Sequence, residues 1–414
     1  MVFSHKSSNV GANACGEHRM DQMNVDQSRF TRRFALGKLC SAACALAAAP
    51  MINRGRFCLV AQSSQQVSTR AMDLIHESLV IDMLNQFFYR IDRQQKFNQW
   101  MTKPGAFTEA DFETYKNSGV NVFNFGHAAT GVEPYEQAIR LLADWSSFLA
   151  AYPDWLMRIS TAADFARLKE TKKLGLLFGF QNANHFRSVD DVDVFYGLGQ
   201  RVSQLTYNFR NMIGNGAFER NDGGLSEFGI QIVERMNKVG MAVDVAHAGD
   251  RTQLDAFDAS RKPVIISHGN ARALNNGHPR CISDESIRAL GKSGGVMGIN
   301  FISFMVKAHE PVTADDVVDH FDYVTKLVGI EHVGVGSDYG LESNNFLAPA
   351  ELSRFLTSAD KRYRVHRVEA VVPLQGPDRM YVLTDALIRR GYSDENIRLI
   401  LGQNFRRALT AAWA

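Results

Sequence analysis

The chain has 414 residues, 45% of them hydrophobic, and its 46 basic and 44 acidic side chains give a formal net charge of +2. This length suits one large domain or two ordinary ones, and the near-neutral charge argues against a nucleic-acid partner. No apolar run approaches the roughly eighteen residues that a membrane-spanning helix needs, so we expect no transmembrane anchor.

The first fifty residues have the features of an export signal with a polar region before it. Arg32 and Arg33 form a pair, and a short apolar run follows that ends in Ala47-Ala48-Ala49-Pro50. The arrangement is similar to a twin-arginine signal and predicts a periplasmic protein; a basic tail that happens to precede alanines is the alternative. We therefore divide the chain into residues 1–50 (signal), 51–70 (linker) and 71–414 (folded domain).

The folded part contains a regular series of short apolar runs that end in polar residues. Helical patterns separate most of them, for example residues 135–151 and 225–239. Strands that alternate with helices predict an α/β fold, a (β/α)8 TIM barrel, with a doubly wound open sheet as the alternative. The lack of a glycine-rich phosphate loop after the first strand weakens that alternative. The eight runs are residues 79–83, 120–125, 174–180, 202–207, 241–247, 263–268, 295–301 and 332–338.

Two consecutive runs end in histidines, His247 and His268, with a helical stretch between them. The carboxyl ends of the strands in a parallel barrel face the active site, so the two imidazoles are expected to converge. Neutral imidazole is the commonest metal ligand, and Zn²⁺ needs three or four donors. We interpret the pair as metal ligands or catalytic groups; two unrelated polar caps at strand ends are the alternative.

The other strand ends complete a ring of polar side chains. Asp338 follows Val-Gly-Val-Gly-Ser, where it could ligate a metal or accept a proton from metal-bound water, or simply cap a helix. Arg272 and Arg280 lie in the loop after the sixth run, where either could bind a substrate carboxylate bidentately. The remaining members of the ring are Asn85, Gln86, His127, Gln181, Tyr207 and Asn300.

Several segments together resemble the renal, or membrane, dipeptidase family of metallopeptidases. They are Gly224-Leu-Ser-Glu-Phe-Gly229, Asp244-Val-Ala-His247, Pro263-Val-Ile-Ile-Ser-His268, Val333-Gly-Val-Gly-Ser-Asp338 and Gly402-Gln-Asn-Phe405. The resemblance runs from about Asp73 to Ala408. It implies an amidohydrolase-type barrel of the metallo-dependent hydrolases, in which two bridged zinc ions hydrolyse dipeptides, and it suggests a homodimer.

The resemblance also assigns roles to individual residues. His247 and His268 match ligands of the second zinc, Asp338 matches the aspartate near the bridging water, and Arg280 matches the arginine that binds the substrate carboxylate. Tyr207 stands where the family has a substrate-binding histidine. The resemblance thus places Arg280 and Tyr207, together with Gln181, around the substrate.

Three positions depart from the family pattern. Leu84 and Gln86 stand where a histidine and an aspartate would bind the first zinc, and Gln181 replaces the bridging glutamate. Leucine cannot bind a metal, and glutamine offers only a neutral oxygen that zinc disfavours. We therefore expect at most one Zn²⁺, with a metal-free pocket as the alternative.

Two functions remain open. The first is a zinc-dependent dipeptidase that cleaves dipeptides or similar small amides. The second is an altered family member that binds a small peptide or assists the maturation of a secreted metabolite such as a siderophore. A purely structural role is disfavoured by the retained ring of polar strand ends.

Overall fold

The computed structural model describes residues 67–85, 87, 94–129, 132–341 and 369–414. The predicted signal, most of the predicted linker and Gln86 lie outside these residues. The described part opens with helix α2 (Thr69–Glu77), which begins inside the range predicted to be linker. The Ser68 hydroxyl caps this helix by accepting a hydrogen bond from the Ala71 N–H at 3.3 Å. The division of the chain into signal, linker and domain stays a prediction.

The strands of the described residues are short, and every strand pair is parallel. The first group of hydrogen-bonded strands has the order β1-β2-β4-β3, and two further groups have the orders β5-β6-β7 and β10-β9-β8. Their bounds are β1 (Ile81–Asp82), β2 (Val122–Asn124), β3 (Leu156–Ile159), β4 (Leu174–Leu177), β5 (Gly179–Phe180), β6 (Val202–Gln204), β7 (Ala242–Asp244), β8 (Ile266–Gly269), β9 (Met297–Ile299) and β10 (Val333–Val335).

Backbone hydrogen bonds join the three groups into a closed barrel. Strand β4 continues into β5 after one residue, so these two act as one position in the ring. The Val245 N–H donates to the Ile265 carbonyl at 3.0 Å between β7 and β8, and the Met83 N–H donates to the Val335 carbonyl at 3.0 Å between β1 and β10. The last contact closes the ring, which confirms the predicted barrel and excludes the open sheet.

Strand β3 was not predicted from the sequence. It pairs with β4 in the register Leu156↔Leu174 to Ile159↔Leu177, outside the eight positions of the barrel. The second half of the same barrel position, β5, pairs with β6 instead. The Arg201 guanidinium bridges the junction, since its Nε donates to the Ser160 carbonyl at 2.9 Å. With only Leu156 and Ile159 buried, the segment lacks the continuous apolar run that marks the other strands.

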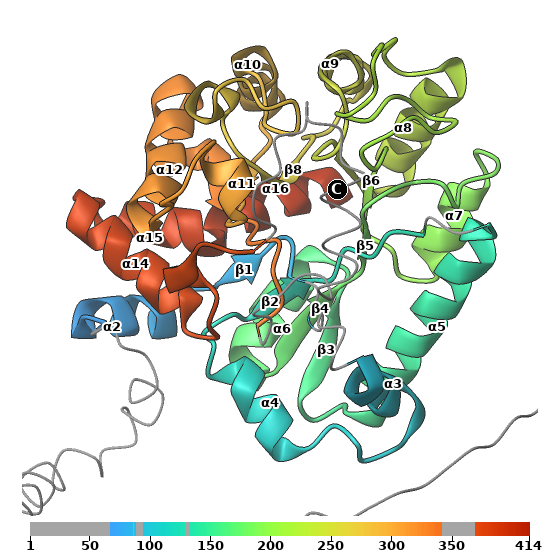
Figure 1. The fold of residues 1–414 in the computed structure, drawn as a ribbon. Coiled ribbons are helices and arrows are strands. Elements are labelled where there is room, and N and C mark those ends of the chain that lie inside the picture. Colours follow the sequence, from blue (N-terminus) through green and yellow to red (C-terminus); the bar gives the residue numbers. More distant parts are fainter. Residues whose placement is uncertain (1–66, 86, 88–93, 130–131, 342–368) are drawn as a thin grey trace, which may run out of the picture. The chain divides into compact units, whose positions relative to one another are not determined.

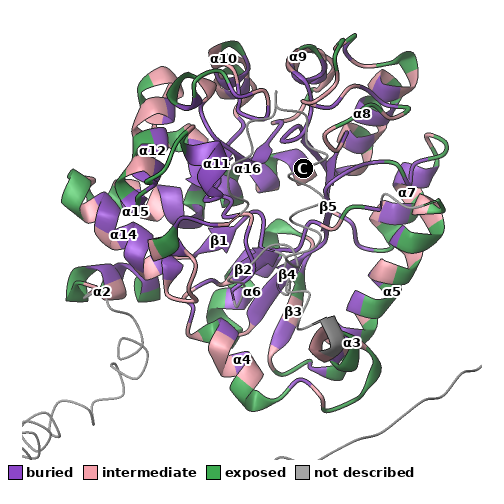
Figure 2. Ribbon diagram, in the orientation of Figure 1, coloured by how far each residue is buried: buried purple, intermediate pink, exposed green. Residues whose placement is uncertain are grey.

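Helices surround the barrel, with buried inner faces and exposed outer faces (Figures 1 and 2). Helix α8 shows how the sequence encodes this arrangement. Its apolar residues Ile232, Val233 and Met236 recur at helical spacing and are buried, and the Ser226 side chain caps its first turn. Gly240 ends the helix in a left-handed conformation (φ 82°), and a side chain at this position would meet the Trp413 carbonyl. The glycine therefore lets the chain turn directly into β7.

The α-helices that follow α2 in the described residues are α3 (Gln94–Thr102), α4 (Glu109–Lys116), α5 (Pro134–Ala151), α6 (Ala162–Thr171), α7 (Asp191–Gly197), α8 (Glu227–Val239), α9 (Asp250–Ala259), α10 (Asp284–Ser293), α11 (Ser303–Val306), α12 (Ala314–Val328), α14 (Arg379–Arg390), α15 (Asp394–Arg398) and α16 (Asn404–Trp413). Among the described residues, 3₁₀ turns occur at Arg272–Asn275, Ile330–His332 and Val372–Leu374. None of the described helices is both long and apolar enough to cross a membrane.

The helical segment at the C-terminal end is interrupted by a π-helical turn. This turn, Leu399–Gln403, joins α15 to α16 and places Gly402 against the Leu79 carbonyl. Beyond it, the Asn404 side-chain amide donates to the carbonyls of Ile330 and Val333 at 2.8 and 2.9 Å. Phe405 then packs on Gly334 at the start of β10, where a side chain at 334 would lie 2.6 Å from the ring. Helix α16 therefore seals the amino end of the barrel.

Two apolar clusters fill the fold. The smaller one joins the starts of the strands to α16 and includes Ile81, Val122, Val202, Phe405 and Ala408. The larger one fills the space between the barrel and the helices. Because the amino end of the barrel is closed by apolar packing, the polar strand ends at the opposite end are where chemistry can occur.

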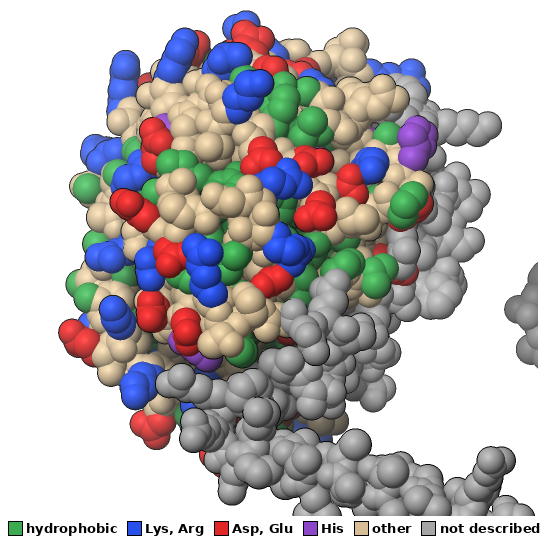
Figure 3. All heavy atoms as spheres, turned by 90° about the vertical axis from the view of Figure 1, so that its left-hand side faces the viewer, with side chains coloured by type: hydrophobic (Ala, Val, Ile, Leu, Met, Phe, Trp, Pro, Cys, Tyr) green, Lys and Arg blue, Asp and Glu red, His purple; other side chains and the backbone are tan. Residues whose placement is uncertain are grey.

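The surface that carries α2, α12 and α14 has basic and acidic side chains interspersed (Figure 3). Arg390 on α14 pairs with both Asp319 and Asp322 on α12, at 2.7 and 2.5 Å. Arg398 pairs with Glu77 on α2 at 2.9 Å. These exposed pairs each contribute little to stability, and they neutralise the charge of this face locally.

Candidate functional site

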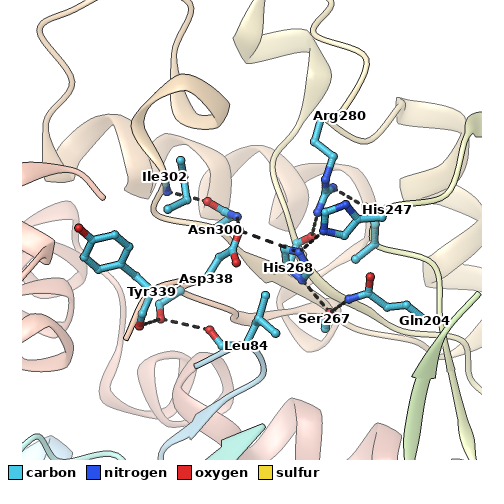
Figure 4. Close-up of polar contacts among 12 residues, drawn as sticks. Leu84, Gln204, His247, Ser267, His268, Arg280, Asn300, Ile302, Asp338 and Tyr339 are labelled. Carbon is cyan, nitrogen blue, oxygen red and sulfur yellow. Dashed lines mark hydrogen bonds and ion pairs between the residues drawn. The ribbon is translucent and has the colours of Figure 1, made fainter. Parts of the chain in front are cut away.

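The two histidines predicted to converge lie side by side at the carboxyl end of the barrel (Figure 4). His247 follows β7 by three residues, and His268 belongs to β8. Their Nε2 atoms are 2.9 Å apart, and their side chains come from residues with 7% and 0% of their surface exposed. The two histidines are 21 residues apart in the sequence. The parallel arrangement of β7 and β8 brings them together.

A buried carboxylate holds the two strand ends together. Asp244, the last residue of β7, accepts hydrogen bonds from the Ala246 and Ser267 N–H groups, both at 3.0 Å. Burial raises the pKa of Asp244, and these hydrogen bonds oppose that rise. Asp244 therefore fixes the backbone on which both histidines stand.

Each imidazole has a partner at its other nitrogen. Nδ1 of His247 is 2.8 Å from Oδ1 of Asn208, and Nδ1 of His268 is 2.9 Å from the Ser267 hydroxyl. The Tyr207 ring stacks on His247 with a centroid distance of 4.3 Å. Burial lowers the pKa of both histidines well below the usual value, and the positive charge of Arg280 adds to this effect. Both rings are therefore neutral near pH 7.

Arg280 lies buried beside the histidines, with 2% of its surface exposed. Its guanidinium donates to the Ala246 carbonyl and, at 3.5 Å, to the His268 carbonyl. Arg272, the other arginine considered from the sequence, instead forms a bidentate pair with Asp250 at 2.5 and 2.6 Å. Of the two candidates, the structure thus places Arg280 at the histidine pair.

Asp338 completes the group from the end of β10. Its Oδ2 is 4.0 Å from Nε2 of His268 and accepts a hydrogen bond from the Asn300 amide at 2.8 Å. Asp338 has a left-handed backbone (φ 59°), and its N–H donates to the Leu84 carbonyl. Burial raises the pKa of the carboxyl to about 7, against the opposing charge of Arg280. The carboxyl can therefore both accept and donate a proton near neutral pH.

A buried network supports the strained turn at Asp338. The side chain of Asp82 accepts from the N–H and hydroxyl of Ser337 at 2.8 and 2.6 Å. Arg379, at the start of α14, donates to the carbonyls of Tyr339 and Gly340 at 2.5 and 2.6 Å. Sequence reasoning missed Arg379, because it belongs to a helix outside the strand ends and no local pattern marks an arginine as buried.

The opposite side of the site is occupied by Leu84 and Gln181. Leu84 is fully buried and Gln181 is 4% exposed. A side chain at Gly126 would clash with Cδ1 of Leu84 and lie 2.9 Å from Cγ of Gln181, so both side chains cover this glycine. His127 lies next to it, with its ring against Phe125 and Trp145 and its pKa lowered by burial to about 4. Leu84, which is apolar, and Gln181, which is polar but uncharged, thus lie together on this side of the site.

The sequence pattern that defines the membrane dipeptidases (peptidase family M19) matches residues 68–355. The chain belongs to the membrane dipeptidase family. An uncharacterized dipeptidase of Schizosaccharomyces pombe is 34% identical over 181 residues, 42% of this chain and 43% of that protein. Dipeptidase tcpJ of Claviceps purpurea is 29% identical over 263 residues, 62% of this chain and 56% of that protein. The matched part is thus less than two thirds of each of these relatives.

A solved structure of an amidohydrolase from Pseudomonas aeruginosa has the same fold, with a TM-score of 0.69 and 27% sequence identity. The likeness covers 83% of this chain and 99% of that one. Nearly the whole of that structure therefore has a counterpart in this chain.

The metal-binding side chains of this family member can be compared with the three or four ligands that a zinc site needs. His247 and His268 offer two neutral nitrogens, and Asp338 offers a carboxylate 4.0 Å away. Within the described ranges, no three His, Cys, Asp or Glu side chains are grouped closely enough to hold a metal. Leu84 and Gln181 provide no anionic donor at the other half of the site. The donors that the described residues bring to this site are thus two imidazoles and one carboxylate, which suit zinc better than the neutral Gln181 or the apolar Leu84.

Proposed function

We propose that this protein is an exported dipeptidase-like hydrolase that cleaves dipeptides or similar small amides, with at most one Zn²⁺. The observation that carries the proposal is the pair of neutral imidazoles whose Nε2 atoms lie 2.9 Å apart in a buried site. Two neutral imidazoles aimed at one point are suited to a soft or borderline cation. His247 and His268 would hold the ion, which would act as a Lewis acid in the site.

The other residues of the site have roles that follow from their positions. Arg280 is a buried cation whose guanidinium is fixed by two backbone carbonyls, so it can bind the carboxylate end of a dipeptide in a defined orientation. Asp338, with a pKa raised to about 7, is suited to general-base and general-acid steps. Tyr207, stacked on His247, and Gln181 would contact the substrate from the sides.

Metal content tests the proposal directly. The purified wild-type chain is expected to hold no more than one Zn²⁺, and His247→Ala or His268→Ala should abolish its binding, as measured by elemental analysis. His309→Ala, a change at an exposed histidine, is the matched control and should leave the metal content unchanged. Two ions per wild-type chain would contradict the single-ion site.

A second candidate is favoured by the missing third ligand among the described residues. The protein would then be an altered family member that binds a small peptide or assists the maturation of a secreted metabolite. Calorimetry with dipeptides, with and without added Zn²⁺, separates the two functions. Binding without hydrolysis at saturating Zn²⁺ would support this second function and exclude the peptidase.

A further inference from the structure

Asn208 has a strained backbone directly behind the histidine pair. Its φ is 57°, and the Phe209 N–H donates to the Tyr207 carbonyl across it at 2.6 Å, which forms a very tight turn. The Asn208 carbonyl in turn accepts from the Phe218 N–H at 2.8 Å, and Gly216 allows this close approach because a side chain there would clash with Asn208. The loop therefore holds Asn208 from both sides, and strain of this kind is concentrated at functional sites.

The contact that this turn creates determines which nitrogen of His247 carries the proton. Oδ1 of Asn208 can only accept, so Nδ1 of His247 donates to it at 2.8 Å. A neutral imidazole with its proton on Nδ1 has a lone pair on Nε2. The 2.9 Å contact between the two Nε2 atoms then requires that His268 donate from its own Nε2.

The same reasoning extends to His268. With its proton on Nε2, His268 accepts at Nδ1 from the Ser267 hydroxyl at 2.9 Å. The Ser267 oxygen also accepts from Nε2 of Gln204 at 3.3 Å (Figure 4). With this assignment, each of the four contacts from Gln204 to Asn208 has one donor and one acceptor.

We propose that Asn208 and Ser267 are positioning residues: Asn208 fixes the His247 proton at Nδ1, and Ser267 lets the His268 proton move to Nδ1, so that one metal ion can take both Nε2 lone pairs. The inference rests on the proposed function. Binding at both Nε2 atoms requires that the His268 proton move from Nε2 to Nδ1. The Ser267 hydroxyl permits this move, since it can turn its own proton to the Asp244 carboxylate within its reach and accept from Nδ1 instead. Asn208 already holds His247 in the form that binds.

The side chain of Asn208 can be removed without straining its turn. Asn208→Gly keeps the left-handed backbone accessible and deletes the acceptor, whereas Asn208→Asp keeps an acceptor in place. Asn276→Gly is the matched control, because this exposed asparagine also has a positive φ (46°). Ser267→Ala tests the second residue.

Two measurements on the full chain give separate readouts. In metal-free protein labelled with ¹⁵N-histidine, the wild type is expected to show His247 protonated at Nδ1, and Asn208→Gly should lose this preference. In calorimetric titration with Zn²⁺, Asn208→Gly and Ser267→Ala should each weaken binding by roughly 10- to 100-fold, while Asn208→Asp and Asn276→Gly stay within about threefold of wild type.

The outcomes distinguish this inference from the proposed function. An unchanged His247 proton position in Asn208→Gly would overturn the inference, as would unchanged zinc affinity in that variant when the wild type binds zinc. A shifted proton in Asn208→Gly together with no zinc binding by the wild type would support the positioning role and overturn the single-zinc function.

Discussion

Arg379 is the buried cation whose contacts stabilise the turn that carries Asp338. Replacing it by methionine would remove the guanidinium that donates to the carbonyls of Tyr339 and Gly340. It would also remove the positive charge that opposes the burial-driven rise of the pKa of Asp82. We expect Arg379→Met to reduce the free energy of unfolding by about 3 kcal/mol or more, as measured by urea denaturation. Arg389→Met, at a side chain that is 57% exposed, should change it by less than about 0.5 kcal/mol. Equal effects of the two changes would contradict this role.

Leu84, Gln86 and Gln181 are the positions for a test of the zinc content. We predict that Leu84→His, Gln86→Asp and Gln181→Glu together raise the zinc content above one ion per chain, towards two. Leu84 and Gln181 lie together over Gly126, so the new side chains would supply donors on the side of the site that has none in the described residues. Leu84→Met combined with the same two changes is the control, and elemental analysis is the measurement. A zinc content that stays at one ion or fewer would contradict the prediction. It would show that the residues at these three positions are not by themselves the reason why the first zinc of the family pattern is missing.

The sequence predicted the histidines at the strand ends but not the residues that orient their side chains. His247 and His268 stand out because each ends a run rich in β-branched residues. Asn208 and Ser267 carry no such mark, because their roles depend on a tight turn and on the approach of neighbouring strands. Gln86 lies outside the described residues, so its predicted place in the site is untested.

His320 connects three elements at the side of the barrel. Its Nδ1 accepts from the Ala271 N–H at 3.0 Å, and its Nε2 donates to the Val306 carbonyl at 2.9 Å, so the ring on α12 is tied to the end of β8 and to α11. Burial lowers its pKa to about 4. The unfolded chain therefore binds a proton at this residue below about pH 6.5, while the folded chain does so only below about pH 4.

This difference predicts a loss of stability on acidification. The contribution of neutral His320 is fully present above pH 6.5 and declines as the pH falls towards 4, by up to about 1.4 kcal/mol per pH unit. Urea denaturation at pH 7.5, 6 and 5 should show a steeper decline in wild type than in His320→Gln. His309→Gln, at an exposed histidine, should retain the wild-type slope. Identical slopes in wild type and His320→Gln would exclude this source of acid sensitivity.

Helices were easier to predict than the details of the sheet. The pattern of residues 135–151 and 225–239 matches α5 and α8 closely, because long amphipathic segments carry a strong periodic signal. Strand β3 and the π-helical turn before α16 were missed. Both depend on contacts with distant segments, namely the edge of β4 and the Leu79 carbonyl, that no local pattern reports.

Export of the whole protein remains a proposal that the N-terminal sequence supports. Changing Arg32 and Arg33 together to lysine should leave the protein in the cytoplasm with its signal uncleaved, because the arginine pair is the feature that a twin-arginine pathway reads. Cell fractionation followed by immunoblotting measures the effect. Changing Arg19 to lysine, outside the pair, is the control. Undiminished delivery of the double variant to the periplasm would point to another route.

The seal that α16 forms at the amino end of the barrel has a consequence for how the protein is made. Phe405, Ala408, Leu409 and Ala412 pack against the first residues of strands that the ribosome produced hundreds of residues earlier. The barrel core therefore stays incomplete until translation of this segment has finished. A nascent chain that stalls before α16 exposes apolar strand starts, which invites chaperone capture and proteolysis. Under the proposed twin-arginine export, whose cargo folds before it crosses the membrane, this late seal would withhold incomplete chains from export.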